Sequence, residues 1–206
     1  FGYSDFRDEQ KEIIDTVISG NDALILMPTG SGKSLCYQIP SLVRKGVGIV
    51  ISPLIALMDD QVRFLKSKGI KSIAITSGMH YNEIDTALTN CIYGGIKFLY
   101  LSPERLQNEL VQTRIKEMNI NLITVDEAHC ISEWGHNFRP AYRHISKIRE
   151  IIPNTPVLAL SATATTSVID DIQNNLDFKE HNLIQSSFTR ENLSYVVDNI
   201  EDKKLR

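Results

Sequence analysis

The chain has 206 residues, of which 42% are hydrophobic and 23% charged, a composition typical of a globular protein. A chain of this length buries about 70% of its unfolded surface, which suffices for one large core or two small ones. The net charge of −3 gives no overall basic field, so any contact with nucleic acid must come from a local patch. The three widely spaced cysteines disfavour a disulfide framework or a zinc site, and the strand-sized apolar runs disfavour a membrane span.

Short apolar runs alternate with helical patterns along the whole chain. The runs predict strands at 23–27, 47–52, 73–76, 96–101, 121–125 and 156–161. The helical spacing predicts helices over 6–18, 33–43, 53–68, 83–93, 104–118, 141–151 and 168–176. Continuous Val/Ile/Leu strands bridged by helices indicate an α/β domain with a mostly parallel central sheet and helices on both faces. We expect this domain to span 1–185, and the polar segment 186–206 to be a linker or the truncated start of another unit.

A phosphate-binding loop is predicted between the first strand and the second helix. Its residues are Met27, Pro28, Thr29, Gly30, Ser31, Gly32, Lys33 and Ser34. Glycines let main-chain N–H groups curl around phosphate oxygens, and the helix N-terminus adds a favourable dipole. Lys33 would reach the β- and γ-phosphates of a nucleotide, and the Ser34 hydroxyl would ligate Mg²⁺. Met27 stands where the strict motif has its first glycine, and the alternative is a chance Gly/Ser turn.

Two adjacent carboxylates, Asp126 and Glu127, follow the apolar run 120–125. The first would hold Mg²⁺ and the second would orient or deprotonate an attacking water. An acidic pair after a strand can also be a helix cap, so the interpretation depends on Lys33 and Ser34. We expect His129 to bridge the nucleotide to the neighbouring strand end at Ser161.

The segment after the carboxylates contains the only Trp of the chain, in a polar loop with glycine. Trp134 and Phe138 are four residues apart, a spacing that also suits core packing in a helix. Stacking platforms for single strands pair aromatic rings with cations. The nearby cations are Arg139, Arg143, Lys147 and Arg149. Residue types alone leave DNA stacking and core packing equally open.

Three further segments have a functional and a plain structural interpretation. Tyr3, Arg7 and Gln10 precede the phosphate loop, and Gln offers a donor and an acceptor that match an adenine edge. From the residues alone, an amphipathic helix with an exposed Gln is the simpler explanation. The strand-to-helix junctions at Ser52-Pro53 and at 102–105, with Ser102 and Arg105, suit the phosphates of a nucleic-acid strand but are also ordinary turns.

Taken in order, these segments resemble the first motor lobe of a superfamily 2 helicase, specifically of the RecQ family. The matching segments are FGYSDFRDEQ, MPTGSGKS, ISPLIALMDDQV, LYLSPERL, DEAH, ALSATA and CISEWGHNFRPAY. The last resembles the aromatic-rich loop that follows DEAH in RecQ proteins, and the resemblance covers about 1–190. It implies a RecA-like P-loop NTPase fold and ATP-dependent 3′-to-5′ DNA unwinding in recombination and repair.

The resemblance also implies roles for individual residues. Tyr3, Arg7 and Gln10 would receive adenine, while Lys33, Asp126, Glu127 and His129 would serve hydrolysis with ATP and Mg²⁺. Trp134, His136, Phe138 and Arg139 would sense single-stranded DNA and license hydrolysis.

The chain starts at Phe1 and resembles a fragment, so we expect the second lobe with its arginine finger to lie outside it. We therefore expect the chain alone to bind nucleotide weakly and to hydrolyse it negligibly. The expected partners are single-stranded and partly duplex DNA and the second lobe, with no membrane. The protein would act at the bacterial nucleoid or in a eukaryotic nucleus. A nucleotide-dependent binding module and an RNA helicase or remodeller of the same superfamily remain alternatives.

Overall fold

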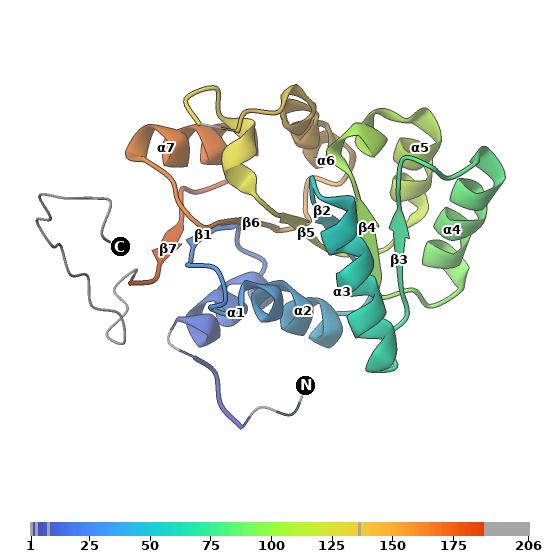
Figure 1. The fold of residues 1–206 in the computed structure, drawn as a ribbon, viewed down its shortest axis with the longest axis horizontal. Helices are drawn as coiled ribbons and strands as arrows, with labels where there is room; N and C mark the ends of the chain where they lie inside the picture. The colour runs from blue at the N-terminus through green and yellow to red at the C-terminus, as the bar shows by residue number, and fades with distance from the viewer. Residues whose placement is uncertain (1, 3, 8, 136, 188–206) are drawn as a thin grey trace, which may run out of the picture.

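The computed structural model describes residues 2, 4–7, 9–135 and 137–187, which form a seven-stranded sheet (Figure 1). All recorded strand pairs are parallel, in the order β3-β4-β2-β5-β6-β1-β7. The strands are β1 Ala23–Leu26, β2 Val47–Ile51, β3 Ser72–Ile75, β4 Phe98–Leu101, β5 Ile120–Val125, β6 Val157–Ser161 and β7 Leu183–Gln185. The carboxyl ends of β2, β5, β6 and β1 are therefore neighbours along one edge of the sheet.

Helices cover both faces of the sheet (Figure 1). One face packs against α1 (Gln10–Ile18), α2 (Lys33–Val43) and α3 (Ile55–Ser67). The other face packs against α4 (Tyr81–Tyr93), α5 (Glu109–Glu117), α6 (Ser146–Ile151) and α7 (Thr166–Asn175). The 3-10 helices are η1 (Pro103–Gln107), η2 (Ala128–Ile131) and η3 (Pro140–Ile145). This arrangement confirms the predicted α/β class and the predicted mostly parallel sheet.

The core consists of two apolar layers, one on each side of the sheet. Every residue of β1, β2, β4 and β6 is buried. In such doubly covered strands both alternating faces must be apolar, which explains the continuous Val/Ile/Leu runs. The carboxyl ends of the strands are left as the edge where polar loops gather, and this is where open α/β sheets bind ligands.

The amino ends of the strands are closed by a buried ion pair. Two guanidinium nitrogens of Arg149 donate to the two carboxylate oxygens of Asp22 at 3.0 and 2.7 Å. Arg149 also donates to the carbonyls of Thr155 and Asp177, and Asp22 accepts the main-chain N–H of Val157. Both charges are almost fully hydrogen-bonded, which is the condition under which buried charge is tolerated.

The sequence prediction missed one strand and simplified two helices. The helix expected at 104–118 is the 3-10 helix η1 followed by α5. β7 pairs in parallel with β1 although its three residues alternate exposed, buried, exposed. The helix expected at 141–151 begins as the 3-10 helix η3 and becomes α-helical only at Ser146. Residues 188–206 lie outside the described part, so the expected boundary at 185/186 stays a prediction. In the described part of the chain, no helix has the length and apolar character needed to cross a membrane.

Candidate nucleotide site and aromatic loop

The phosphate loop connects β1 to α2 in a conformation that its glycines allow. Gly30 and Gly32 have φ values of +82° and +92°, in the left-handed region that side chains disfavour. A Cβ atom on Gly32 would also collide with the amide nitrogen of Gln10. Lys33 and Ser34 open α2, so their main-chain N–H groups belong to the first turn, where no intrahelical acceptor exists. The loop therefore presents donors to an anion, as the sequence predicts.

Gln10 holds this loop in place. Its side chain is buried, and its Nε2 donates to the carbonyls of Ser31 and Gly32 at 3.2 and 3.4 Å. Its Oε1 accepts the main-chain N–H of Arg7 at 2.9 Å. Gln10 is thus not the exposed residue of the plain amphipathic interpretation. A contact with adenine stays a prediction for Gln10 and the exposed Arg7, and Tyr3 lies outside the described residues.

Met27 differs from the rest of the loop because its side chain is 2% exposed and packs in the core. Only its main chain can therefore face a nucleotide. The Ser31 hydroxyl donates to the carbonyl of Pro28 at 2.6 Å and stabilises the turn itself. Thr29 and Gly30 are exposed at the mouth of the site.

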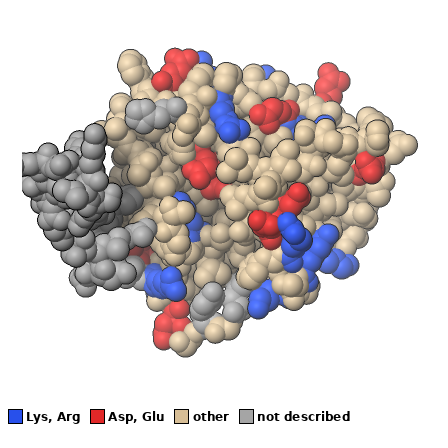
Figure 2. Space-filling model, viewed as in Figure 1, with Lys and Arg blue, Asp and Glu red and all other residues tan. Residues whose placement is uncertain are grey.

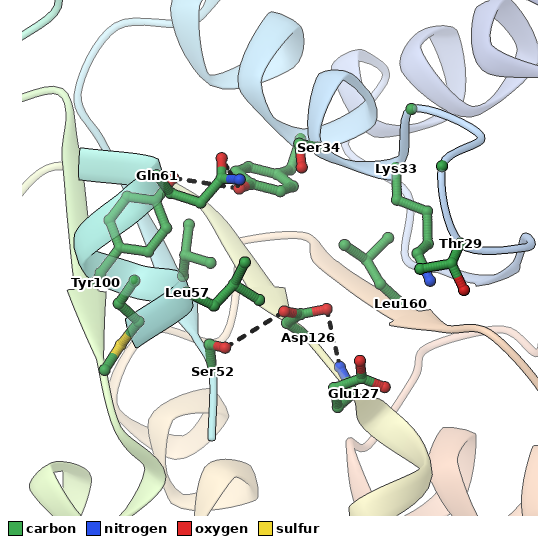
Figure 3. Close-up of a pocket in the computed structure, with 15 residues that line it drawn as sticks. Thr29, Lys33, Ser34, Ser52, Leu57, Gln61, Tyr100, Asp126, Glu127 and Leu160 are labelled. Atoms are coloured by element: carbon green, nitrogen blue, oxygen red, sulfur yellow. Dashed lines mark hydrogen bonds between the residues drawn. The ribbon is translucent and has the colours of Figure 1, made fainter. Parts of the chain in front are cut away.

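A cavity of about 340 Å³ extends from the phosphate loop to the end of β5 (Figure 3). Its lining includes Thr29, Gly30, Gly32, Lys33, Ser34, Tyr37, Ser52, Gln61, Tyr100, Asp126 and Glu127. The phosphate-loop lysine and the two carboxylates, more than ninety positions apart in the sequence, thus share one cavity. The structure brings together the residues that the sequence predicts for nucleotide hydrolysis.

The Asp126 carboxylate is held by groups from two strand ends. Its Oδ2 accepts the Ser52 hydroxyl at 3.3 Å, and its Oδ1 accepts the main-chain N–H of Glu127 at 3.0 Å (Figure 3). The Tyr142 hydroxyl donates to the main-chain carbonyl of Asp126 at 2.9 Å. Burial raises the pKa of Asp126 above its ordinary value, and the neighbouring Glu127 carboxylate raises it further. The Glu127 N–H, Lys33 and Ser52 oppose this rise, and a bound cation would oppose it too.

Glu127 occupies a strained backbone position. Its φ and ψ are 48° and 45°, the left-handed region that costs an L-residue about 1–2 kcal/mol. This conformation turns the chain sharply from β5 into η2 and sends the Glu127 side chain into the cavity beside Asp126 (Figure 3). Strain of this kind persists where the surrounding structure enforces it, and it concentrates at functional sites.

His129 connects Glu127 to the end of β6. Its Nδ1 lies 3.1 Å from the Ser161 hydroxyl and 3.3 Å from Glu127 Oε2. Because the Ser161 hydroxyl donates to the carbonyl of Thr163, its oxygen must accept from the histidine. The proton therefore sits on Nδ1, shared between Ser161 and Glu127. The predicted contact between His129 and the Ser161 strand end is confirmed.

We call the loop between η2 and η3 the aromatic loop; its described residues are 132–135 and 137–139. Its aromatic residues are not in the core. The Trp134 side chain is 78% exposed, so the core-packing alternative is wrong for this residue. Phe138 is half-buried, and the Arg143 guanidinium lies 5.1 Å from its ring centroid. Arg143 also forms an ion pair with Glu133 at 2.8 Å. An aromatic ring paired with a cation is the arrangement that single-strand platforms use.

Arg139 ties the end of this loop to the junction after β2. Its guanidinium donates to the carbonyl of Pro53 at 3.3 Å, and its main-chain N–H donates to the carbonyl of Cys130. The two segments border a second cavity of about 550 Å³. Its lining residues are Pro53, Leu54, Glu127, His129, Cys130, Asn137, Phe138 and Arg139. Glu127 thus lines both this cavity and the nucleotide cavity, and His129 lines this one. His136 lies outside the described residues.

The structure corrects or redirects several other expectations. Arg149 is buried in the ion pair with Asp22 at the opposite end of the sheet, so its assignment to a stacking platform is wrong. The Ser52 hydroxyl is directed toward Asp126 and not outward. Arg105 donates to the carbonyl of Thr76 at 2.6 Å, and Ser102 is buried. Contacts of Ser52, Ser102 and Arg105 with nucleic acid stay predictions.

Sequence reasoning missed the residues that support the site from behind. Tyr142 is fully buried and fixes the carbonyl of Asp126, yet its position in the sequence gave only a helical pattern. Tyr37, Gln61 and Tyr100 line the nucleotide cavity from α2, α3 and β4. Their hydroxyl and amide groups bond to one another, the two hydroxyls at 3.2 Å. Polar residues within otherwise apolar periodic runs were the available signal.

Fold and site together define the nucleotide-binding lobe of a RecA-like P-loop NTPase. The profile of the DEAD/DEAH box helicase family matches residues 7–172. The chain therefore belongs to the DEAD/DEAH box helicase family.

Curated relatives come from the RecQ branch. The chain is 42% identical over 202 residues to the probable ATP-dependent DNA helicase RecS of Bacillus subtilis, with 98% of this chain and 40% of that protein covered. It is 43% identical over 205 residues to the ATP-dependent DNA helicase RecQ of the same bacterium, with 98% and 35% covered. The chain thus spans less than half the length of these relatives, and it resembles RecQ helicases along nearly all of its own length.

Solved structures agree on the fold. The helicase domain of Pyrococcus furiosus Hef superimposes with a TM-score of 0.65 at 23% identity, covering 87% of this chain and 38% of that one. A hypothetical ATP-dependent RNA helicase from Sulfolobus tokodaii gives 0.69 at 19% identity, covering 90% and 54%. At these identities the similarity establishes the RecA-like fold alone.

Proposed function

We propose that this chain is the ATP-binding motor lobe of a RecQ-type helicase that unwinds DNA in the 3′-to-5′ direction during recombination and repair. One observation carries the proposal. Glu127 and His129 line the cavity that borders the aromatic loop, and Glu127 also lines the cavity of the phosphate loop. The residue that we propose to activate water thereby lines one cavity together with the segment that we propose to meet DNA. The curated relatives, which are named ATP-dependent DNA helicases, support the choice of reaction.

Mg²⁺ fits the oxygen ligands at the end of β5. The Asp126 carboxylate is half-buried and shares its cavity with the Ser34 hydroxyl and the Glu127 carboxylate. Hard oxygen donors of this kind, with ATP phosphates, are what Mg²⁺ requires. Ser34 and Asp126 would hold the ion, which would neutralise charge on the phosphates.

The remaining steps fall to residues of the chain. The N–H groups of the phosphate loop and the Lys33 ammonium bind the β- and γ-phosphates and stabilise the charge that develops on them. Glu127 accepts the proton of the attacking water. His129 Nδ1–H is shared between Glu127 and Ser161, so it holds the glutamate and orients it toward the water.

DNA would meet the exposed side of the aromatic loop. Trp134 offers an open ring face for a base, and Phe138 with Arg143 offers a second ring next to a cation. The face shown in Figure 2 has Lys and Arg interspersed with Asp and Glu and shows no continuous basic stripe. On this face, stacking and not a broad electrostatic field would therefore carry much of the contact.

The complete machine would include a second motor lobe that closes the ATP cleft and supplies an arginine finger, as the resemblance implies. The chain alone should therefore bind nucleotide weakly and hydrolyse it negligibly. Single-stranded and partly duplex DNA are the proposed substrates. The proposed location is the bacterial nucleoid or the eukaryotic nucleus, according to the source of the chain.

Glu127→Gln in the complete protein tests the proposal. Removal of a general base costs about 10²–10⁴-fold in rate, so hydrolysis should fall by that factor while the Kd for ATP stays unchanged. The exposed Glu150→Gln, on α6 and away from both cavities, is a control matched in chemistry and should leave the rate unaltered. Normal hydrolysis in Glu127→Gln would refute the role of Glu127, whereas a complete protein that binds ATP without any turnover would be a binding module and not a motor.

The choice between DNA and RNA needs its own measurement. Single-stranded DNA and RNA of the same sequence are compared as activators of ATP hydrolysis by the complete protein. The proposal expects stimulation by DNA to exceed stimulation by RNA. Equal stimulation, or a preference for RNA, would favour an RNA helicase or remodeller.

A further inference from the structure

The first half of the aromatic loop is fixed to α7 through a buried serine. Ser132 is fully buried, and its hydroxyl donates to Asp171 Oδ2 at 2.7 Å. The main-chain N–H of Trp134 donates to the same Ser132 oxygen at 3.2 Å. A hydroxyl has one hydrogen and two lone pairs, so donation to Asp171 leaves a lone pair free to accept from Trp134. The three residues form a chain of hydrogen bonds from α7 to the exposed tryptophan.

Packing of α7 against η2 fixes the acceptor end of this chain of hydrogen bonds. Val168 and Ile172 of α7 belong to the same apolar cluster as Ala128 and Ile131 of η2. Asp171 is adjacent to Ile172 in the sequence, on a helix whose apolar side is seated against η2. The acceptor is thus carried by a packed element, whereas the Trp134 side chain that depends on it is open to solvent.

Gly135 completes the turn that lifts Trp134 away from η2. A Cβ atom at this position would lie 2.9 Å from the carbonyl oxygen of His129 and 3.3 Å from that of Ser132. The main-chain N–H of Gly135 donates to the Ser132 carbonyl at 3.1 Å. The Ser132 hydroxyl therefore holds the main chain at Trp134, and the Ser132 carbonyl holds it at Gly135.

We propose that Asp171 is a positioning residue, which sets the place of Trp134 through the Ser132 hydroxyl. α7 directly follows the segment 161–165, where Ser161 contacts His129. The pair Asp171–Ser132 thereby gives the aromatic loop a second connection to the end of β6, independent of the one through His129. The consequence for DNA-stimulated hydrolysis rests on the proposed function, while the positioning of Trp134 does not.

Intrinsic fluorescence tests the positioning directly, because Trp134 is the only tryptophan of the chain. A hydrogen bond to a charged acceptor shifts an equilibrium by about tenfold or more, so its removal should raise the population of detached loop by that factor. Ser132→Ala and Asp171→Ala should each lower the steady-state anisotropy of Trp134, and the double variant should be no lower than either single one. Asp170→Ala, an exposed neighbour on the same helix, is the matched control and should leave it unchanged.

A conservative variant separates positioning from general destabilisation. Asp171→Asn keeps an oxygen that accepts the Ser132 hydroxyl, so it should retain the wild-type anisotropy even if it lowers the melting temperature. Wild-type anisotropy in both Ser132→Ala and Asp171→Ala overturns the proposal, as does a drop in Asp171→Asn equal to that in Ser132→Ala. If Asp171→Ala does not fold, the comparison of Ser132→Ala with Asp171→Asn decides alone.

The activity of the complete protein provides a second, separable readout. Ser132→Ala should reduce the stimulation of ATP hydrolysis by single-stranded DNA several-fold and leave the Kd for ATP unaltered. If the wild-type protein shows no stimulation by DNA, the proposed function fails, and the fluorescence result for the loop still stands. If stimulation is normal in a variant with a detached Trp134, the link from loop position to hydrolysis is refuted.

Discussion

At the amino ends of the strands, Asp22 and Arg149 form an ion pair and make hydrogen bonds with four further main-chain groups, those of Thr155, Val157, Asp177 and Lys179. At the carboxyl ends, by contrast, Asp126 and Glu127 stand side by side as like charges. The ion pair at the amino ends has exposed fractions of 5% and 2% for its side chains. The carboxylates at the other end are half-buried, and burial raises the pKa of one of them. The same sheet thus pairs opposite charges at one edge and places two like charges next to each other at the other.

Each edge also contains a non-glycine residue in the left-handed region. Asp177, with φ of 50°, gives its carbonyl to Arg149 at the amino edge. Glu127, with φ of 48°, turns the chain into the cavity at the carboxyl edge. Backbone strain therefore occurs at both edges. The neighbouring charges distinguish them, because Asp177 lies beside a satisfied ion pair and Glu127 lies beside a second carboxylate. The comparison makes distinct predictions for the two edges.

The largest expected effect is on stability and concerns the amino edge. Arg149→Ala leaves Asp22 as a buried, unpaired charge and should lower the free energy of unfolding by about 4 kcal/mol. Equilibrium unfolding in urea measures this change. Arg114→Ala, which removes a more exposed pair with Asp85, should cost less than about 1 kcal/mol and serves as the control. Equal losses in the two variants would show that the buried pair has no special role.

At the carboxyl edge, Asp126→Asn should raise the free energy of unfolding of the ligand-free chain, whereas Arg149→Ala lowers it. The raised pKa means that the folded state holds this proton more tightly than the unfolded state. The stability from Asp126 is therefore full below the ordinary carboxyl pKa and is lost as pH rises through the folded pKa. At pH 7 the substitution should raise the free energy of unfolding by about 1 kcal/mol while Mg²⁺-dependent nucleotide binding is lost.

Urea titrations between pH 3 and pH 7, with and without Mg²⁺ and nucleotide, measure both parts of this prediction. The exposed Asp170→Asn on α7 should change neither stability nor binding. A destabilised Asp126→Asn chain, or one that still binds the nucleotide with its Mg²⁺ dependence intact, contradicts the account of this carboxylate.

The smallest expected effect concerns the two left-handed residues. Glu127→Gly and Asp177→Gly should each raise the free energy of unfolding by about 0.5 kcal/mol, since relief of strain exceeds the entropy that glycine adds to the unfolded chain. Asp170→Gly within α7 should instead lower it, by about 0.3 kcal/mol, because Asp and Gly differ by little in helix propensity. Thermal unfolding ranks the three variants. Loss of stability in Glu127→Gly would mean that its conformation is not strained.

Much of the fold and site follows from the sequence because the decisive patterns are local. The residue order of the phosphate loop fixes its backbone, and an apolar run followed by Asp126 and Glu127 places carboxylates at a strand end. The exposure of Trp134 was left open by spacing alone, because a spacing of four residues suits a core helix as well as a loop. Glycine at 135 decides between them, since its close approach to His129 requires a turn.

What the sequence could not give depends on contacts between distant segments. Arg149 is one cation among several near the aromatic loop, and only the fold shows that the partner is Asp22 at the other edge. β7 has a single buried residue and gains its strand character from pairing with β1. Tyr142 and Gln10 are ordinary members of helical patterns until their side chains are seen to bond to Asp126 and to the phosphate loop.

The central claim is that the carboxylate site and the aromatic loop act together. Its most direct test is the rate of ATP hydrolysis by the complete protein, with and without single-stranded DNA, in the wild type and in Trp134→Ala. The account predicts that stimulation by DNA falls sharply in Trp134→Ala while the Kd for ATP and the DNA-independent rate stay at their wild-type values. Full stimulation in Trp134→Ala would contradict it.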